Sequence, residues 1–463
     1  MRVFLMISVG AFLSACAVKE PVSRDLTLDL PDRYSVIAPV TKPRAEDLQW
    51  WRNFGDPVLD RLIEQGLSGN LSVAQARERL REAEADARRA RGSVFTGNGQ
   101  ARANARRNGA DTGEIQLSGE INLAGRDQRR AEAALARLDA ARINTEEARR
   151  LVLTEIAVTY LNLRFQQQIL RTRKQDLASR RRTVEDVEIQ LAAGAATRLD
   201  QLRTRSLAAE TRVEIPSIEA EIIRQRNRLT TLMGVPVGAL GIDLRYQGYQ
   251  PMPKRIADTG VPADLLRARP DIRRAERLYA AAVSDVEAAR AARYPSLTLT
   301  GLLSAPLSGG ASSSSLLAGL VLPVFTQPAL AAEVDAADAR VNQAYLQWRI
   351  AVLRAVEEVE TAQSRLRTSL NATAASREVV AMNVEALELS RWMLESRGNI
   401  TVLDVVDRER ALSGSRVALA RSIRDVATSY VDLRSALGQG HGFADETPRT
   451  ATAPQEPSAT TDG

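Results

Sequence analysis

The sequence has little of the side chains that most enzymes use. Its 463 residues contain one cysteine, Cys16, and one histidine, His441. Zinc clusters and Cys–His or Ser–His catalytic sets need more of these residues than the chain supplies. We therefore expect no catalytic residues, no metal site and no cofactor, and we expect that the protein is not an enzyme.

Aromatic residues and lysines are also scarce. Aromatic side chains make up 4% of the chain, and the net charge of +6 is carried almost wholly by arginine, because Lys19, Lys42, Lys174 and Lys254 are the only lysines. The arginines alternate with acidic residues along helical stretches and form no basic face with interleaved aromatics, which argues against nucleic acid as a partner. The abundance of Ala, Leu, Glu and Arg favours long helices packed through small residues.

No apolar run long enough for a membrane-spanning helix follows the N-terminus. The start itself, Met1-Arg2 followed by an apolar run to Leu13, is typical of a signal peptide over residues 1–15. The following Leu13-Ser14-Ala15-Cys16 resembles a bacterial lipobox, in which the thiol of Cys16 is acylated, palmitate being one such lipid. The next residue, Ala17, is not the aspartate that commonly holds such lipoproteins in the inner membrane, so the resemblance implies sorting to the outer membrane. The alternative is an ordinary signal peptide that ends near a cysteine by chance.

What the sequence does contain is an internal repeat. A ten-residue stretch that begins at Gly398 and ends at Asp407 recurs, weakened, over residues 194–200. Residues 194–234 aligned on residues 398–438 without a gap are identical at eight of 41 positions, where unrelated sequences would share about two or three. Among the identical pairs are Thr197 with Thr401, Leu199 with Leu403, and Asp200 with Asp404. We interpret the chain as a duplication in which each half carries an acidic turn.

Two segments in matching places of the two halves change from a helical period to a period of two, which predicts strands. The first, at about residues 97–123, alternates polar residues such as Gln100, Arg102 and Gln116 with small or apolar ones; the second lies at about residues 296–322. One polar and one apolar face is the pattern of a transmembrane β-barrel. A soluble hairpin packed on helices is the alternative. Four strands cannot close a barrel around a polar lumen, so a barrel requires several chains.

The remaining segments predict long helices. A 3,4 heptad spacing of mostly apolar residues runs from Ile272 to Arg293, from Tyr345 to Leu366 and from Leu419 to Leu437, which indicates coiled-coil seams. About 70 residues separate the first hairpin from the turn at Gly194. As one helix they would extend on the order of 100 Å.

Several motifs together identify a family. They are Trp51-Arg52-Asn53-Phe54-Gly55-Asp56-Pro57, Leu265-Leu266-Arg267-Ala268-Arg269-Pro270-Asp271-Ile272-Arg273-Arg274, Tyr294-Pro295-Ser296, Leu322-Pro323-Val324-Phe325 and Leu403-Asp404-Val405-Val406-Asp407. With them the chain resembles the TolC-like outer-membrane efflux proteins, specifically the lipid-anchored channel subunits of resistance-nodulation-division (RND) pumps. The resemblance covers residues 16 to about 440.

The resemblance implies a mainly α fold with a small β part, assembled as a homotrimeric duct. Each protomer would give four strands to a shared 12-stranded transmembrane β-barrel and long coiled-coil helices to a periplasmic tunnel. The implied partners are a periplasmic adaptor protein, an inner-membrane RND pump and outer-membrane lipid in a Gram-negative bacterium. The implied function is passive export of drugs or other small molecules from the pump to the outside.

On this basis we divide the chain as follows. Residues 1–15 are the signal peptide, 16–48 an extended lipid-anchored segment, 49–250 the first structural repeat with its tip near 194–200, 251–440 the second repeat with its tip near 398–407, and 441–463 a disordered tail. Two other functions stay open at this point. One is an outer-membrane duct for type I protein secretion, and the other is a periplasmic structural coiled-coil lipoprotein, which would conduct no ions.

The acidic turns are the candidate gate. Asp404 and Asp407 are one helical turn apart and share a face, and three copies would place a ring of carboxylates around a narrow pore, with Leu403 beside it and Asp200 in the matching turn. Some family members carry an arginine in the second turn, where this chain has Ile400. We expect Arg198 or Arg410 to pair with Asp200 or Asp407 instead. The alternative is that these aspartates merely cap a helix start.

Overall fold

The computed structural model describes residue 26 and residues 45–93, 96–104, 111–256, 269–307, 309–396 and 400–440. The expected signal peptide, Cys16, His441 and the expected tail lie outside the described residues. The elements in chain order are the 3₁₀ helix η1 (Ala45–Phe54), α2 (Pro57–Gly69), α3 (Leu71–Gly92), β1 (Thr96–Asn104), β2 (Thr112–Asn122), α4 (Arg126–Ala192), α5 (Arg198–Leu232), α7 (Pro270–Ala291), β3 (Ser296–Pro306), β4 (Ser313–Val321), α8 (Gln327–Glu395) and α9 (Val402–Ala436). None of the helices described is both long and apolar enough to cross a membrane.

The chain forms two compact units. Among the described residues, unit 1 contains residue 26 and those within 74–145 and 262–357, and unit 2 contains those within 45–73, 146–261 and 358–440. Each unit therefore takes residues from both halves of the sequence, and the helices α3, α4 and α8 contribute to both units.

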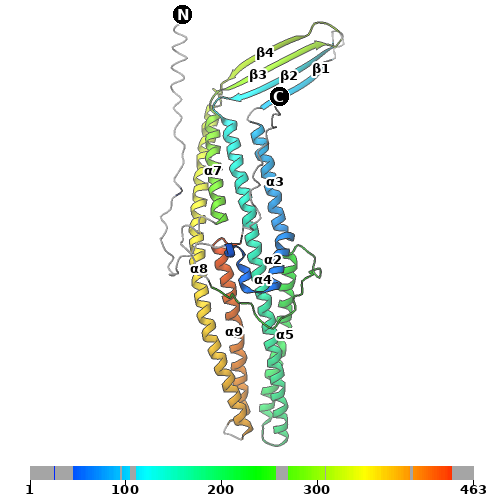
Figure 1. Ribbon diagram of the computed structural model, residues 1–463, viewed down its shortest axis with the longest axis vertical. Helices are drawn as coiled ribbons and strands as arrows, with labels where there is room; N and C mark the ends of the chain where they lie inside the picture. The colour runs from blue at the N-terminus through cyan, green and yellow to red at the C-terminus, as the bar shows by residue number, and fades with distance from the viewer. Residues whose placement is uncertain are drawn as a thin grey trace, which may run out of the picture. The chain divides into compact units, whose positions relative to one another are not determined.

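Unit 1 contains a four-stranded antiparallel sheet in the order β1-β2-β3-β4 (Figure 1). The two predicted hairpins pair with each other through β2 and β3, which are joined from Asn122 opposite Ser296 to Thr112 opposite Pro306. Both strand segments that the period of two predicts are confirmed. The outer edges of the sheet, β1 and β4, have no further strand beside them among the described residues.

The helical core of unit 1 follows the predicted seams. Ile272 of α7 packs with Trp348, Val352 and Ala355 of α8, and Tyr279 and Val286 of α7 pack with Ala337 and Val341. These side chains are at most 5% exposed. Because the seam residues recur at spacings of three and four, one stripe of each helix is buried along its length.

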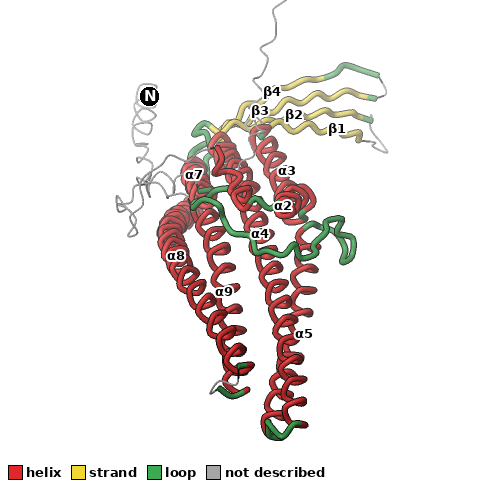
Figure 2. Tube along the Cα trace, turned by 60° about the horizontal axis from the view of Figure 1, so that its bottom comes forward, coloured by secondary structure: helices red, strands yellow, loops and turns green. Residues whose placement is uncertain are grey.

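Unit 2 contains two helical hairpins, the second half of α4 with α5 and the second half of α8 with α9 (Figure 2). The helices α5 and α9 each have 35 residues, begin after a threonine N-cap and end before a glycine with positive φ, Gly234 at 72° and Gly438 at 73°. A positive φ suits glycine, which has no Cβ to clash. The two helices that contain the sequence repeat thus begin and end in the same way.

A buried polar chain lies where η1 and α2 meet α4 in unit 2. Asp56 is fully buried, and its carboxylate caps α2 by accepting from the backbone N–H groups of Val58 (2.9 Å) and Leu59 (3.2 Å). The other carboxylate oxygen accepts from the hydroxyl of Tyr160 (2.6 Å), which accepts in turn from Nε of Arg164 (2.8 Å). Burial, and next the Asp56 carboxylate, raise the pKa of Tyr160, so its hydroxyl stays protonated.

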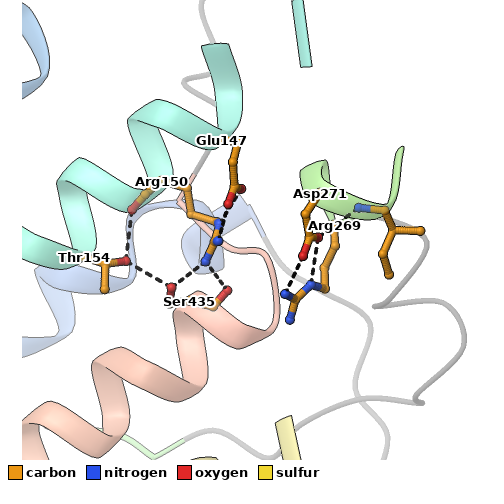
Figure 3. A network of polar contacts seen from close by, with 7 residues as sticks. Glu147, Arg150, Thr154, Arg269, Asp271 and Ser435 are labelled. Carbon is orange, nitrogen blue, oxygen red and sulfur yellow. Dashed lines mark hydrogen bonds and ion pairs between the residues drawn. The ribbon is translucent and has the colours of Figure 1, made fainter. Parts of the chain in front are cut away.

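Two further contacts in this region join η1 and α4 to α9. Trp50 stands edge to face with Tyr430 of α9 at 6.3 Å between ring centroids. Arg150 of α4 forms an ion pair with Glu147 (2.6 Å) and donates to the backbone carbonyl of Ser435 (2.8 Å) in the last turn of α9 (Figure 3). A cation suits this position because the last carbonyls of a helix carry partial negative charge.

We predict that Tyr160→Phe destabilises unit 2. The substitution leaves the carboxylate of Asp56 and Nε of Arg164 without their shared buried partner, and each such loss costs about 1–3 kcal/mol. The midpoint of thermal unfolding, followed by circular dichroism, should fall. Tyr294→Phe is the control, because no hydrogen bond of the Tyr294 hydroxyl is present among the described residues. Equal midpoints for the two variants would contradict the role of the Asp56–Tyr160–Arg164 chain.

Candidate functional site: the faces of the sheet and the two acidic turns

The register of the sheet gathers polar side chains on one face. Residues paired across neighbouring strands share a face, and successive residues of a strand alternate between faces. Gln100 pairs with Gln116, Arg102 with Glu114, and Glu120 with Thr298. These positions, two residues apart along each strand, all lie on the same face, as the sequence predicts for the lumen side.

The opposite face is small or apolar. Leu117 pairs with Gly99 on one side and with Gly301 on the other, and Leu299 pairs with Gly119 and Ala318. Ile115, Leu117 and Leu303 of this face are exposed in the single chain. β4 departs from the pattern, because Leu316 and Leu317 are neighbours on opposite faces and both are exposed. Its polar residues, Ser313 to Ser315, are gathered at its start.

The two acidic turns have the same hydrogen-bonded geometry in unit 2. In the second turn the carboxylate of Asp404 accepts from the backbone N–H (2.8 Å) and the hydroxyl (2.7 Å) of Thr401, and the Thr401 hydroxyl accepts from the N–H of Asp404 (3.4 Å). Asp200 and Thr197 make the same three contacts at 3.0, 2.6 and 3.2 Å. Each pair is a capping box at the start of its helix.

These contacts change the acidity of both aspartates. Hydrogen bonds from the side chain and then the backbone of Thr401 lower the pKa of Asp404, and those from Thr197 do the same for Asp200. Both carboxylates are therefore ionised at neutral pH. Asp404 and Asp200 do cap helix starts, and they keep their negative charge while doing so.

Asp407 differs from Asp404 in that its carboxylate has no hydrogen bond or ion pair to any described residue. It is exposed one turn further along α9, and Leu403 and Ile400 beside it are half-buried. Arg410 is also exposed and has no partner among the described residues. The ion pair expected between Arg410 and Asp407 is absent within the described part of one chain.

Arg198 is engaged elsewhere. Its guanidinium donates to the side chain of Gln201, whose amide donates to Glu188 of α4 (3.3 Å). Glu188 also accepts from Nε of Arg205 (3.0 Å), and this hydrogen bond lowers the pKa of Glu188. Glu188 and Arg205 thus join α4 to α5 just above the first turn, and Arg198 is not paired with Asp200 in the described chain.

A buried charge near the second turn was not predicted. Glu409 is 6% exposed, and its Oε1 accepts from Arg391 of α8 (2.7 Å) and from Ser179 (2.8 Å) and Thr183 (3.2 Å) of α4. It therefore connects both hairpins of unit 2. The sequence does contain a signal for the burial of Glu409, because Val405, Glu409 and Leu412 follow the 3,4 spacing of the buried face of α9.

Nearby, Asp176 of α4 accepts from the hydroxyl of Ser413 of α9 (2.5 Å), which also accepts from Arg173 (2.7 Å). Arg173 forms an ion pair with Glu214 of α5 (2.7 Å). Within the described residues, no group of histidine, cysteine and acidic side chains has an arrangement that could hold a metal ion. These contacts are structural, and the charged side chains are paired with one another.

A sheet with one polar and one apolar face, combined with long seamed helices that end in acidic turns, is typical of a channel protein of the outer membrane. The model of the outer membrane efflux protein family matches residues 62–235 and 261–439. The chain belongs to this family.

Individual proteins are similar to this chain over most of its length. The chain is 32% identical over 450 residues to nodulation protein T of Rhizobium leguminosarum bv. trifolii, which covers 93% of this chain and 95% of that protein. It is 31% identical over 434 residues to the pyoverdine export outer membrane protein OpmQ of Pseudomonas putida, with 85% and 88% covered. Among solved structures, the outer-membrane channel OprN superimposes with a TM-score of 0.83 at 26% identity, covering 91% of this chain and 99% of OprN.

These findings confirm three predictions made from the sequence. The fold is mainly helical with one small antiparallel sheet, the location is the outer membrane of a Gram-negative bacterium, and the function is that of an exit duct in efflux.

The two faces of the sheet predict opposite responses to added charge. Arginine at Leu117 or Leu299 would place a charge on the apolar face, at a cost of roughly 2–4 kcal/mol near the middle of a membrane. Gln116→Arg, one position away on the polar face, should be tolerated. The measurement is the amount of folded protein in purified outer membranes. Equal yields for Leu117→Arg and Gln116→Arg would show that the two faces do not differ in environment.

Proposed function

We propose that three copies of the chain form the exit duct of a tripartite efflux system. A periplasmic adaptor protein and an inner-membrane RND pump would deliver the substrate, and the duct would conduct drugs or other small molecules passively, without chemistry. Each protomer would give β1 to β4 to a shared 12-stranded barrel.

The observation that carries this proposal is the two-faced sheet, whose edge strands β1 and β4 have no neighbouring strand among the described residues. Unpaired backbone groups of β1 and β4 cannot lie in lipid, so the sheet needs neighbours on both sides. A neighbouring copy places its β1 beside β4, and repetition closes the ring. The polar face, with Gln100, Gln116 and Glu120, then lines a water-filled lumen.

The experiment is a planar bilayer recording on the purified protein. Insertion should produce steps of ionic conductance, because an open barrel with a polar lumen conducts ions. The oligomeric state in detergent, measured by light scattering, should be that of a trimer. A protein that inserts as a trimer and never conducts would argue for a structural lipoprotein.

We further propose that the acidic turns form the periplasmic gate. Asp404 and Asp407, with Leu403 beside them, would ring the pore in the trimer, and Asp200 would lie in the other turn of each copy. The lowered pKa values of Asp404 and Asp200 support charged carboxylates there. Because Asp407 and Arg410 are exposed and have no partner within the described chain, pairing between copies is available to both. Arg198 would join such a pairing only by leaving Gln201.

Removal of the carboxylates should therefore change ion selectivity. Asp404→Asn together with Asp407→Asn should lower the preference for cations and weaken block by multivalent cations in bilayer recordings, because acidic rings attract cations. Thr401→Ala is the matched control, since it removes the capping hydroxyl and keeps both charges. If Thr401→Ala changes selectivity as much as the double variant, capping and not pore charge is the role of these aspartates.

We also propose that Cys16, which lies outside the described residues, is acylated. Several acyl chains hold a protein firmly on a membrane, whereas one chain binds only marginally. Mass spectrometry of the membrane-extracted protein should find lipid on an N-terminal Cys16, and Cys16→Ser should lose it. An unmodified mature N-terminus in the wild-type protein would refute the lipid anchor.

A further inference from the structure

A groove of about 690 Å³ lies within unit 2, between α4, α5 and the segment that follows α5. Leu170 and Ala178 of α4, Ile222 of α5, and Ile242 and Leu244 of the following segment give it an apolar floor. Its volume falls within the range of about 300–1,000 Å³ that small organic ligands occupy in proteins. Neither the sheet nor the acidic turns take part in it.

The third wall of the groove is fixed to α4 by hydrogen bonds. The side-chain amide of Gln167 donates to the carbonyl of Leu244 (2.7 Å), and the buried guanidinium of Arg164 donates to the carbonyl of Arg245 (2.7 Å). The hydroxyl of Tyr246 donates to Gln168. The wall is therefore formed before any ligand arrives, which reduces the entropy cost of binding.

The charges around the groove are not balanced. Arg226 of α5 is exposed, and its guanidinium has no partner among the described residues. The guanidinium of Arg171 of α4 has only neutral partners there, the carbonyl of Gly248 (3.4 Å) and the side chain of Tyr246. The other cations of the lining are neutralised: Lys174 pairs with Glu219 (3.1 Å) and Arg245 pairs with Asp243 (2.7 Å). Two guanidinium groups thus remain uncompensated beside an apolar floor.

We propose that this groove binds a small amphipathic monoanion, with a carboxylate or sulfonate head on a compact apolar body. A guanidinium presents paired N–H donors that match such a head, so Arg171 and Arg226 would hold it. The apolar body would displace water from Leu170, Ile222 and Leu244. Neutral and cationic molecules of the same shape bind weakly, because they leave both arginines without a counter-charge. This site is additional to the duct.

The probe is 2-naphthalenesulfonate, titrated calorimetrically into the full chain in nanodiscs of zwitterionic lipid, with empty nanodiscs as the blank. Saturable binding at one molecule per protomer is expected, and it should weaken as salt rises, because both cations are near the surface. The neutral 2-naphthalenesulfonamide should bind roughly tenfold or more weakly, the size expected for one lost charged hydrogen bond. Absence of saturable binding, or equal binding of the sulfonamide, overturns the proposal.

Variants locate the site. Arg226→Gln should weaken binding of 2-naphthalenesulfonate roughly tenfold or more. Arg228→Gln is the matched control, because it lies two residues along α5, pairs with Glu155 and does not line the groove. Ala178→Trp keeps every charge and fills the groove from an exposed position, so it should abolish binding. Wild-type affinity in Arg226→Gln or Ala178→Trp would refute this location, whatever the conductance of the channel.

Discussion

The open edges of the four-stranded sheet are the constraint on which the rest of this molecule depends. A sheet that ends in unpaired strands cannot rest in lipid, since each free backbone N–H and C=O group would lack a partner. Pairing an edge requires a further strand, and the described residues of one chain supply none beyond β1 to β4. The stable solution is a closed ring of copies, and a ring needs partners placed by symmetry.

The helices, like the strands, occur in matching sets in the two halves of the sequence. Each half of the sequence supplies one strand pair and one helical hairpin with a threonine and aspartate capping box at its turn. The two boxes agree in all three hydrogen bonds, although only a minority of residues in the two helices are identical. Thr and Asp stand at the same places in both turns because each capping box needs both side chains. The division into two sequence repeats stays a prediction, and the compact units each draw on both halves.

The sequence predicts features that are local or periodic. The hairpins follow from a period of two, and the seam of Ile272, Tyr279 and Val286 follows from a spacing of three and four. The sequence alone does not predict contacts between residues that are far apart in the chain. Asp56 meets Tyr160 across 104 residues and Glu409 meets Ser179 across 230, and only tertiary packing decides such contacts. For Asp404 the residues left two roles open, and the structure shows the capping role directly.

One ion pair joins the two helices of each hairpin in unit 2. Arg205 and Glu409 occupy the same position of the repeat, yet they carry opposite charges, and each pairs with an opposite charge on the helix that precedes its turn, Glu188 in α4 and Arg391 in α8. A mistaken hairpin of α4 with α9 would set Glu188 against Glu409, and one of α8 with α5 would set Arg391 against Arg205. Like charges in those places repel. The opposite charges at this shared position therefore favour pairing of each helix with the helix that precedes its own turn over pairing with a helix of the other hairpin.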